Sequence, residues 1–304
     1  MLKQRTINNN NGADGDENVA NIEIKSNSTI TSNRSDNILQ NQHSAKVSAI
    51  SCPSEKELRV PCYCEENVWR LAYRRIFGVL PTSTDIILPS SSTLSTKSSL
   101  SAASMISNNN SLATTIDKEN EQYYAVFVSN DIKCCPMFNQ QASQSPNDPC
   151  YWDYHVILIR SSKKNNSNIN KKNRFAQVLD IDSRLPYPCS LDEYLYGTFD
   201  IDFLNKEASH QKYAPMFRVV RAELFIQNFY SDRMHMFQNG KWLSPQPEYD
   251  CILTDAKNMK LNNSGHKSNL HDYINMSGWK GKESSLMGEV LSLSELRREF
   301  LGEL

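Results

Sequence analysis

The 304-residue chain lacks any long apolar run. The first residues, Met1 to Arg5, are not followed by the apolar stretch of a secretory signal. No segment approaches the ~20 apolar residues of a membrane span. We therefore expect a cytoplasmic protein with no membrane partner. In that reducing compartment its 8 cysteines would be buried thiols, ligands or a nucleophile rather than disulfides.

An excess of charge of either sign is also missing, since 33 Lys and Arg residues stand against 34 Asp and Glu residues. Binding through phosphate contacts usually needs a basic surface, so no nucleic-acid partner is expected. The pairs Lys163-Lys164 and Lys171-Lys172 resemble a nuclear signal. An exposed charged loop explains them better, although a nuclear location stays open.

Aromatic residues are absent from two long polar segments. Residues 1–50 and 82–118 contain no Phe, Tyr or Trp and are rich in Ser and Asn. Such segments cannot bury enough apolar surface to offset the entropy lost on ordering. We expect a disordered low-complexity tail over 1–50 and a single domain over 51–304. Polar loop insertions are expected within that domain at about 82–118, 161–173 and 257–268.

The remaining segments alternate between helix and strand patterns. Helical spacing of apolar residues predicts a helix over 65–80 that ends near Gly78 and Pro81. The patterns Ser190 to Glu193 and Ser292 to Glu295 predict capping boxes of two further helices. Aromatic and β-branched runs predict strands over 123–129, 152–160, 175–182 and 216–221. This order of elements indicates the α+β class, with an antiparallel sheet and helices around it.

Cys64 directly precedes the first predicted helix. Backbone N–H groups at a helix N-terminus stabilise a thiolate and can also bind a developing oxyanion. Glu65 and Glu66 oppose the thiolate electrostatically, so a nucleophile at this position would need a basic partner. From position alone, a buried and inert cysteine is the more common outcome.

His155 lies in the predicted strand 152–160, where a lone histidine is more often structural than catalytic. If this strand pairs with 175–182 as a hairpin about the polar loop 161–173, His155 faces Asp180. Their Cβ atoms would then be ~5 Å apart on one side of the sheet. A carboxylate placed there orients an imidazole and fixes its tautomer. A register error of one residue would separate the two, and Asp182 on the same face is an alternative partner.

The other cysteines suggest a metal site as a rival interpretation. Structural zinc sites usually contain two pairs of cysteines, each pair separated by two residues. Neither Cys62 and Cys64 nor Cys134 and Cys135 have that spacing, and the remaining candidates, Cys150 and Cys189, are single. We therefore expect neither a metal nor another cofactor.

Nine short sequence motifs follow one another over most of residues 60–301. They are Cys62 to Trp69 (CYCEENVW), Tyr124 to Asn130 (YAVFVSN), Trp152 to Val156 (WDYHV), Asp180 to Asp182 (DID), Leu185 to Cys189 (LPYPC), Phe217 to Ala222 (FRVVRA), Ser231 to Met236 (SDRMHM), Asn239 to Trp242 (NGKW) and Leu293 to Leu296 (LSEL). In this order they resemble the protein N-terminal glutamine amidohydrolase family. One segment alone would be weak, whereas the ordered series is specific. The chain departs from the family chiefly in its tail and polar insertions, which fall between the matching segments.

This resemblance implies a papain- or transglutaminase-like core, in which a helix carrying the nucleophilic Cys packs on an antiparallel sheet carrying His and Asp. Carried over by motif position, the nucleophile is Cys64, the base His155 and the orienting acid Asp180. The implied reaction deamidates the side chain of N-terminal glutamine in proteins or peptides, through a thioester, and releases ammonia. The resemblance also implies that the glutamate product feeds an N-degron degradation pathway, in which an arginyltransferase adds Arg.

An enzyme of this kind must also recognise the free α-ammonium of its substrate. Glu65, Asp153 and Asp182 are candidates because each adjoins a triad residue, and Trp152 could form an apolar wall for the Gln methylenes. An ordinary structural role is the alternative for each of them. Nothing in the sequence requires more than a monomer. Two other functions stay open: another Cys–His–Asp enzyme, either a protease or transglutaminase-like, and a catalytically silent peptide-binding module.

Overall fold

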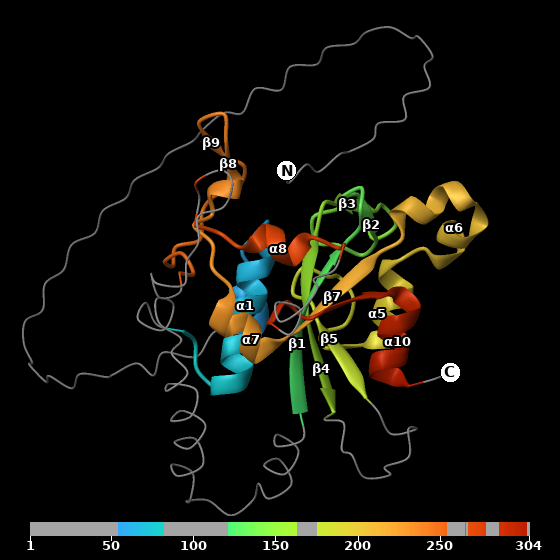
Figure 1. Ribbon diagram of the computed structural model, residues 1–304, viewed down its shortest axis with the longest axis horizontal. Coiled ribbons are helices and arrows are strands. Elements are labelled where there is room, and N and C mark those ends of the chain that lie inside the picture. The colour runs from blue at the N-terminus through green and yellow to red at the C-terminus, as the bar shows by residue number, and fades with distance from the viewer. Residues whose placement is uncertain are drawn as a thin grey trace, which may run out of the picture. The chain divides into compact units, whose positions relative to one another are not determined.

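The computed structural model describes residues 54–81, 121–162, 175–253, 265, 267–277 and 286–302 (Figure 1). These residues belong to one compact unit. The expected tail and the expected insertion at 82–118 lie outside the described residues, as do most of 161–173 and 257–268. Within the described ranges, no helix is long and apolar enough to cross a membrane.

A six-stranded antiparallel sheet forms the centre of this unit, in the order β10-β7-β1-β4-β5-β6. Its strands are β1 (Glu121–Ser129), β4 (His155–Ser162), β5 (Ala176–Leu179), β6 (Cys189–Ser190), β7 (Met216–Arg221) and β10 (Glu289–Ser292). Two small sheets pair β2 (Cys135–Met137) with β3 (Cys150–Trp152), and β8 (Phe237–Gln238) with β9 (Lys241–Trp242). The described elements therefore confirm the predicted α+β class with an antiparallel sheet.

The helices of the described residues vary in length from five residues to fourteen. They are α1 (Cys64–Phe77), α5 (Leu191–Thr198), α6 (Ile201–Lys206), α7 (Ala222–Asn228), α8 (Leu270–Ile274) and α10 (Leu293–Leu301), with 3₁₀ turns η1 (Glu55–Leu58), η3 (Ala208–Tyr213) and η4 (Met234–Met236). Gly78 caps the C-terminus of α1, and its φ of 75° lies in the left-handed region that glycine adopts without a Cβ penalty. Ser190 caps α5 by accepting from the Glu193 N–H, and the Ser292 capping box of α10 is complete in both directions.

Helices cover both faces of the sheet. Side chains alternate along each strand, so each strand contributes to the core on both faces. Ala125 and Phe127 of β1 join the core that contains residues of α1, α7 and α8. Val126 and Val128 point the other way, into the core that contains residues of α5 and α10. Figure 1 shows α1 and α7 on one side of the strands and α5 and α10 on the other. Strand β4 is thus buried between two helical layers.

Two predicted strands have wrong boundaries at aspartates, and β1 also begins two residues before the predicted start, at Glu121. The predicted strand 152–160 is interrupted, since β3 ends at Trp152 and β4 begins at His155. The Asp153 carboxylate accepts from the Tyr154 N–H at 3.0 Å, and its carbonyl accepts from the Ser129 hydroxyl at 2.5 Å. These bonds replace ladder contacts at that point. The predicted strand 175–182 likewise ends at Leu179.

Candidate active site

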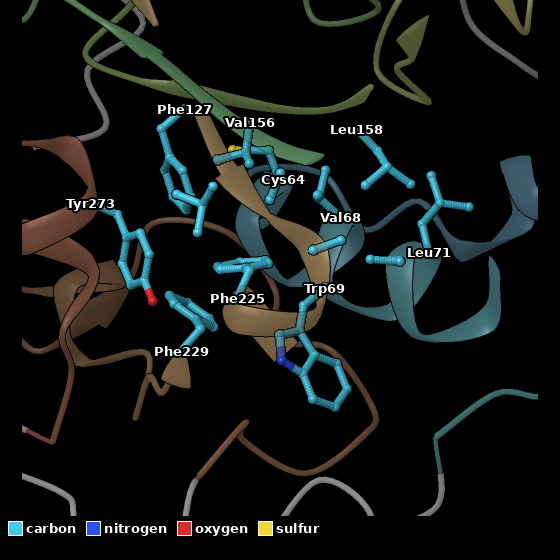
Figure 2. Close-up of a cluster of buried hydrophobic side chains, with 14 of the residues drawn as sticks. Cys64, Val68, Trp69, Leu71, Phe127, Val156, Leu158, Phe225, Phe229 and Tyr273 are labelled. Atoms are coloured by element: carbon cyan, nitrogen blue, oxygen red, sulfur yellow. The ribbon is translucent and has the colours of Figure 1, made fainter. Parts of the chain in front are cut away.

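Cys64 is the first residue of α1, with Tyr63 as its N-cap. The first N–H groups of a helix have no partner inside the helix, so they surround the Cys64 position with donors. The side chain is 6% exposed and points into the core between α1 and β4. Figure 2 shows Cys64 beside Val156, the residue that follows His155 on β4. Helix α1 and strand β4 thus bring the sulfur next to the histidine-bearing end of the strand.

The environment of Cys64 favours the neutral thiol. Burial, followed by the negative charges of Glu65 and Asp182, raises the pKa of the Cys64 thiol well above its usual value. A hydrogen bond from the backbone of Val156 acts in the opposite direction but does not outweigh them. Since the thiolate is the nucleophilic form, a nucleophile at this position would need a base that removes its proton.

His155 and Asp180 form a buried hydrogen-bonded pair. The distance between His155 Nε2 and Asp180 Oδ2 is 3.1 Å, and both side chains are almost completely buried. Burial alone would lower the pKa of His155, but the charge and hydrogen bond of Asp180 raise it. The second ring nitrogen, Nδ1, is buried without a hydrogen-bond partner among the described residues. This leaves one nitrogen held by a carboxylate and the other available to a reacting proton.

The register of β4 and β5 differs from the predicted hairpin by two residues. Leu158 pairs with Leu179. Continued past the end of β5, this register would place Asp182, not Asp180, opposite His155. A shift of two residues keeps every side chain on its face of the sheet, whereas a shift of one would not. Asp180 therefore remains on the side of His155 and reaches the imidazole diagonally.

Two aromatic side chains that flank this pair hold it in place. The Tyr194 hydroxyl on α5 donates to Asp180 Oδ2 at 2.7 Å, and the Asp182 N–H donates to Oδ1 at 2.9 Å. Burial alone would raise the pKa of Asp180, but His155 and these hydrogen bonds lower it. The Trp152 ring stacks on the His155 ring, with centroids 5.8 Å apart and planes 22° apart. Asp180 is thus kept ionised while the plane of the imidazole is fixed.

Trp152 and the three acidic residues expected to contact the substrate differ in their burial and in their bonding partners. Trp152 is buried against His155. Asp182 forms an ion pair with Arg59, whose Nε lies 2.6 Å from Oδ1. Burial raises the pKa of Asp153, which is half-buried and bonded to the Tyr154 N–H.

Glu65 is completely buried beside Cys64. Its Oε2 accepts from the Tyr154 hydroxyl at 3.0 Å and lies 3.6 Å from the Cys64 sulfur as a hydrogen-bond acceptor. His235 Nε2 lies 3.4 Å from the other oxygen, Oε1. Of the candidate acidic residues, Glu65 is therefore the one seen to accept a hydrogen bond from the Cys64 thiol among the described residues.

The sequence reasoning missed several residues that hold these groups, among them Tyr194, Tyr154, Arg59, His235 and Arg233. Tyr194 had a usable signal: it follows Leu191 by three residues on the apolar face of α5, and a buried tyrosine hydroxyl usually needs a partner. The others lie in loops, at a strand boundary or on a short 3₁₀ turn, where no periodic pattern marks them.

A metal centre is not formed by these residues. Within the described ranges, no group of three or more His, Cys, Asp or Glu side chains could hold a metal ion. Cys62, Cys64, Cys134, Cys135, Cys150, Cys189 and Cys251 are free thiols.

Comparison with known proteins gives one consistent result. The model of a family described as N-terminal glutamine amidase matches residues 105–300. That range contains His155 and Asp180, while Cys64 precedes it. The chain is 33% identical over 245 residues to a Bos taurus protein named protein N-terminal glutamine amidohydrolase, covering 79% of this chain and 84% of the relative. Relatives of the same name are 32% identical in Homo sapiens, over 79% of this chain and 85% of the relative, and 30% identical in Drosophila melanogaster, over 79% and 87%.

Proposed function

Because the chain belongs to the protein N-terminal glutamine amidohydrolase family, we propose that it hydrolyses the side-chain amide of N-terminal glutamine, giving glutamate and ammonia. The observation that carries this proposal is the buried His155–Asp180 hydrogen bond beside the segment that packs on Cys64. A helix-borne cysteine packed on an antiparallel sheet that carries the histidine also supports a papain- or transglutaminase-like core.

The first half of the reaction forms a thioester. His155 Nδ1 takes the proton of the Cys64 thiol, and the Asp180 carboxylate stabilises the resulting imidazolium. The sulfur attacks the δ-carboxamide carbon, and N–H groups in the first turn of α1 stabilise the oxyanion. His155 returns the proton to the departing nitrogen, so the C–N bond breaks and ammonia leaves.

The second half restores the enzyme. A water gives a proton to His155 and attacks the γ-glutamyl thioester, which breaks the C–S bond. The Cys64 sulfur regains its proton and the substrate residue is now glutamate. This sequence of steps needs no redox partner and no metal. In the cell, the new N-terminal glutamate would be a substrate for an arginyltransferase, which places the reaction in an N-degron pathway.

The direct test is ammonia release from a short peptide with a free N-terminal Gln, compared with Asn-initiated, acetyl-Gln and internal-Gln peptides. We expect release from the first peptide alone. Release from all Gln peptides would instead indicate a general glutaminase or transglutaminase-like enzyme, which incorporation of a primary amine would identify. Peptide-bond cleavage would indicate a protease. No reaction by the folded protein would favour a silent peptide-binding module.

The nucleophile is tested with two neighbouring cysteines. Changing Cys64 to Ala removes the sulfur that forms the thioester, so turnover should be lost while the unfolding transition is retained. Cys62 lies two residues away and is half-buried, so Cys62→Ala is a matched control that should keep most of the activity. Activity retained in the Cys64 variant, or lost equally in both, contradicts the assignment.

A further inference from the structure

The proposed reaction requires a group that recognises the α-ammonium of the substrate, and two of the three acidic candidates are already engaged. Asp182 has its charge balanced by Arg59 at 2.6 Å. Asp153 is only half-buried and accepts a backbone hydrogen bond from Tyr154 at 3.0 Å, so solvent and this N–H group already stabilise its charge. A carboxylate whose charge is already balanced by a cation or stabilised by solvent gains less from a further cation.

Glu65 differs from both because it is fully buried with one oxygen unsatisfied. Its Oε2 is bound by the Tyr154 hydroxyl, but Oε1 has no hydrogen-bond partner among the described residues. A buried carboxylate oxygen without a donor is costly and usually marks a place where a donor binds. The missing donor would lie next to the nucleophile, since Oε2 of the same carboxylate is 3.6 Å from the Cys64 sulfur.

His235 lies on the solvent side of Glu65, and a protonated ring at this position would form an ion pair with the carboxylate. Its Nε2 lies 3.4 Å from Glu65 Oε1, yet neither ring nitrogen has a hydrogen-bond partner within the described ranges. The His235 side chain is 25% exposed whereas Glu65 is 0% exposed, so this side of the carboxylate leads toward solvent. With the proton of the neutral ring on Nδ1, His235 Nε2 and Glu65 Oε1 are two neighbouring acceptors, which suit a positively charged group with several N–H donors.

The segment that carries His235 is fixed to the start of α1. Arg233 Nε and Nη2 bind the two oxygens of Glu66 at 2.9 and 2.8 Å. Ser244 accepts from the Tyr63 hydroxyl at 3.4 Å and donates to the Pro61 carbonyl at 3.3 Å. These contacts lie before and after His235 in the chain. They fix its position relative to Glu65 and Cys64 at the start of α1.

We propose that Glu65 Oε1 and His235 Nε2 bind the α-ammonium of the N-terminal glutamine and so determine the specificity of the enzyme for a free amine; this rests on the proposed function. The length of the substrate fits. The α-nitrogen is four bonds from the δ-carbon, roughly 5 Å when extended. With the δ-carbon at the Cys64 sulfur, the ammonium reaches the Glu65 carboxylate. An internal glutamine has no charged amine to offer there.

The same contact would make the ammonium part of catalysis. The charge of Glu65 raises the pKa of the Cys64 thiol, second only to burial. A bound ammonium neutralises that charge and so removes opposition to the developing thiolate. Binding energy from the amine would then appear in kcat as well as in KM. A substrate without the amine should lose turnover rate, not only affinity.

The test compares two substrates that differ only in the amine: a Gln-initiated peptide and its desamino analogue, whose first residue is a 4-carbamoylbutanoyl group. In Glu65→Gln, which keeps the size of the side chain, we expect kcat/KM for the Gln peptide to fall about 10- to 100-fold. The value for the desamino peptide should stay unchanged or rise. An equal fall for both substrates would show that Glu65 acts on the reaction and not on the amine, and would overturn the proposal.

Matched variants separate this site from its rivals. Asp182→Asn and Asp153→Asn should change both substrates by the same factor, and a change of amine selectivity in either of them but not in Glu65→Gln refutes the assignment. His235→Ala, at a partly exposed position, should lower amine selectivity several-fold through loss of one acceptor. Unchanged selectivity there refutes the role of His235. A wild-type protein that releases no ammonia from the Gln peptide would refute the proposed function itself, which is a separate outcome.

Discussion

Removal of one partner of the buried Glu66–Arg233 ion pair should be among the most destabilising single substitutions in this unit. Arg233 Nε and Nη2 each donate to one oxygen of the Glu66 carboxylate, and the side chains of Arg233 and Glu66 are 3% and 0% exposed. Arg233 also donates to the Asp250 carbonyl at 3.1 Å and lies over the Tyr249 ring, 5.0 Å from its centroid. The pair joins α1 to a segment more than 160 residues away, so its loss affects the start of the helix that carries Cys64.

Arg233→Met keeps the bulk of the side chain but leaves the Glu66 carboxylate buried without a cation. Removing one partner of such a pair typically costs about 3–5 kcal/mol of unfolding free energy. Burial raises the pKa of Glu66 even though Arg233 opposes the shift, so the pKa in the variant should be higher still. A carboxyl whose folded pKa exceeds its unfolded value is stabilising below the unfolded value. That contribution is lost as pH rises through the folded value, by up to about 1.4 kcal/mol per pH unit.

Urea denaturation at pH 5 and pH 7.5 measures this directly. We expect the penalty of Arg233→Met to be clearly larger at pH 7.5. The pair Arg75–Glu55 is a matched control, because its side chains are 27% and 16% exposed with a separation of 2.6 Å. Arg75→Met should cost about 1 kcal/mol or less. The reasoning is refuted if Arg233→Met costs no more than Arg75→Met, or if its cost does not increase with pH.

Two further predictions concern the pair at the centre of the site. In Tyr194→Phe, Asp180 loses a hydrogen bond that lowers its pKa, so the pair binds protons more tightly. The acid limb of the pH profile of kcat/KM should therefore move to higher pH, by up to about one unit; a shift to lower pH contradicts this. If the three residues act as proposed, Asp180→Asn removes the carboxylate on His155 and should lower kcat by about 10³- to 10⁴-fold, as the same change does in serine-protease triads. Asp182→Asn leaves the His155–Asp180 hydrogen bond in place, so kcat in steady-state assays should fall less than about 10-fold. An equal fall of kcat in both variants would contradict the choice of Asp180 as the orienting acid.

The main elements of the fold could be predicted because their patterns are long and periodic. The predicted strand 216–221 coincides with β7, and the predicted helix over 65–80 corresponds to α1, which ends at Phe77 with Gly78 as its C-cap. The boundary errors at Asp153 and Asp180 have a different origin. Each carboxylate captures a nearby backbone N–H, which ends the ladder although the apolar pattern continues. Short elements such as β8, β9 and η4 depend on tertiary contacts and have no periodic signal of their own.

The choice between Asp180 and Asp182 shows where inference from sequence stops. The alternation of a strand places both on the face of His155, and an error of two residues in register does not change that face. The face of the sheet on which the two aspartates lie can therefore be predicted from the sequence, whereas the aspartate that bonds to His155 cannot. The partner is decided by residues from other elements: Tyr194 on α5 binds Asp180, and Arg59, before α1, binds Asp182. Those contacts exist only once the helices close over both faces of the sheet, so the identity of the acid is a property of the packed structure and not of the strand.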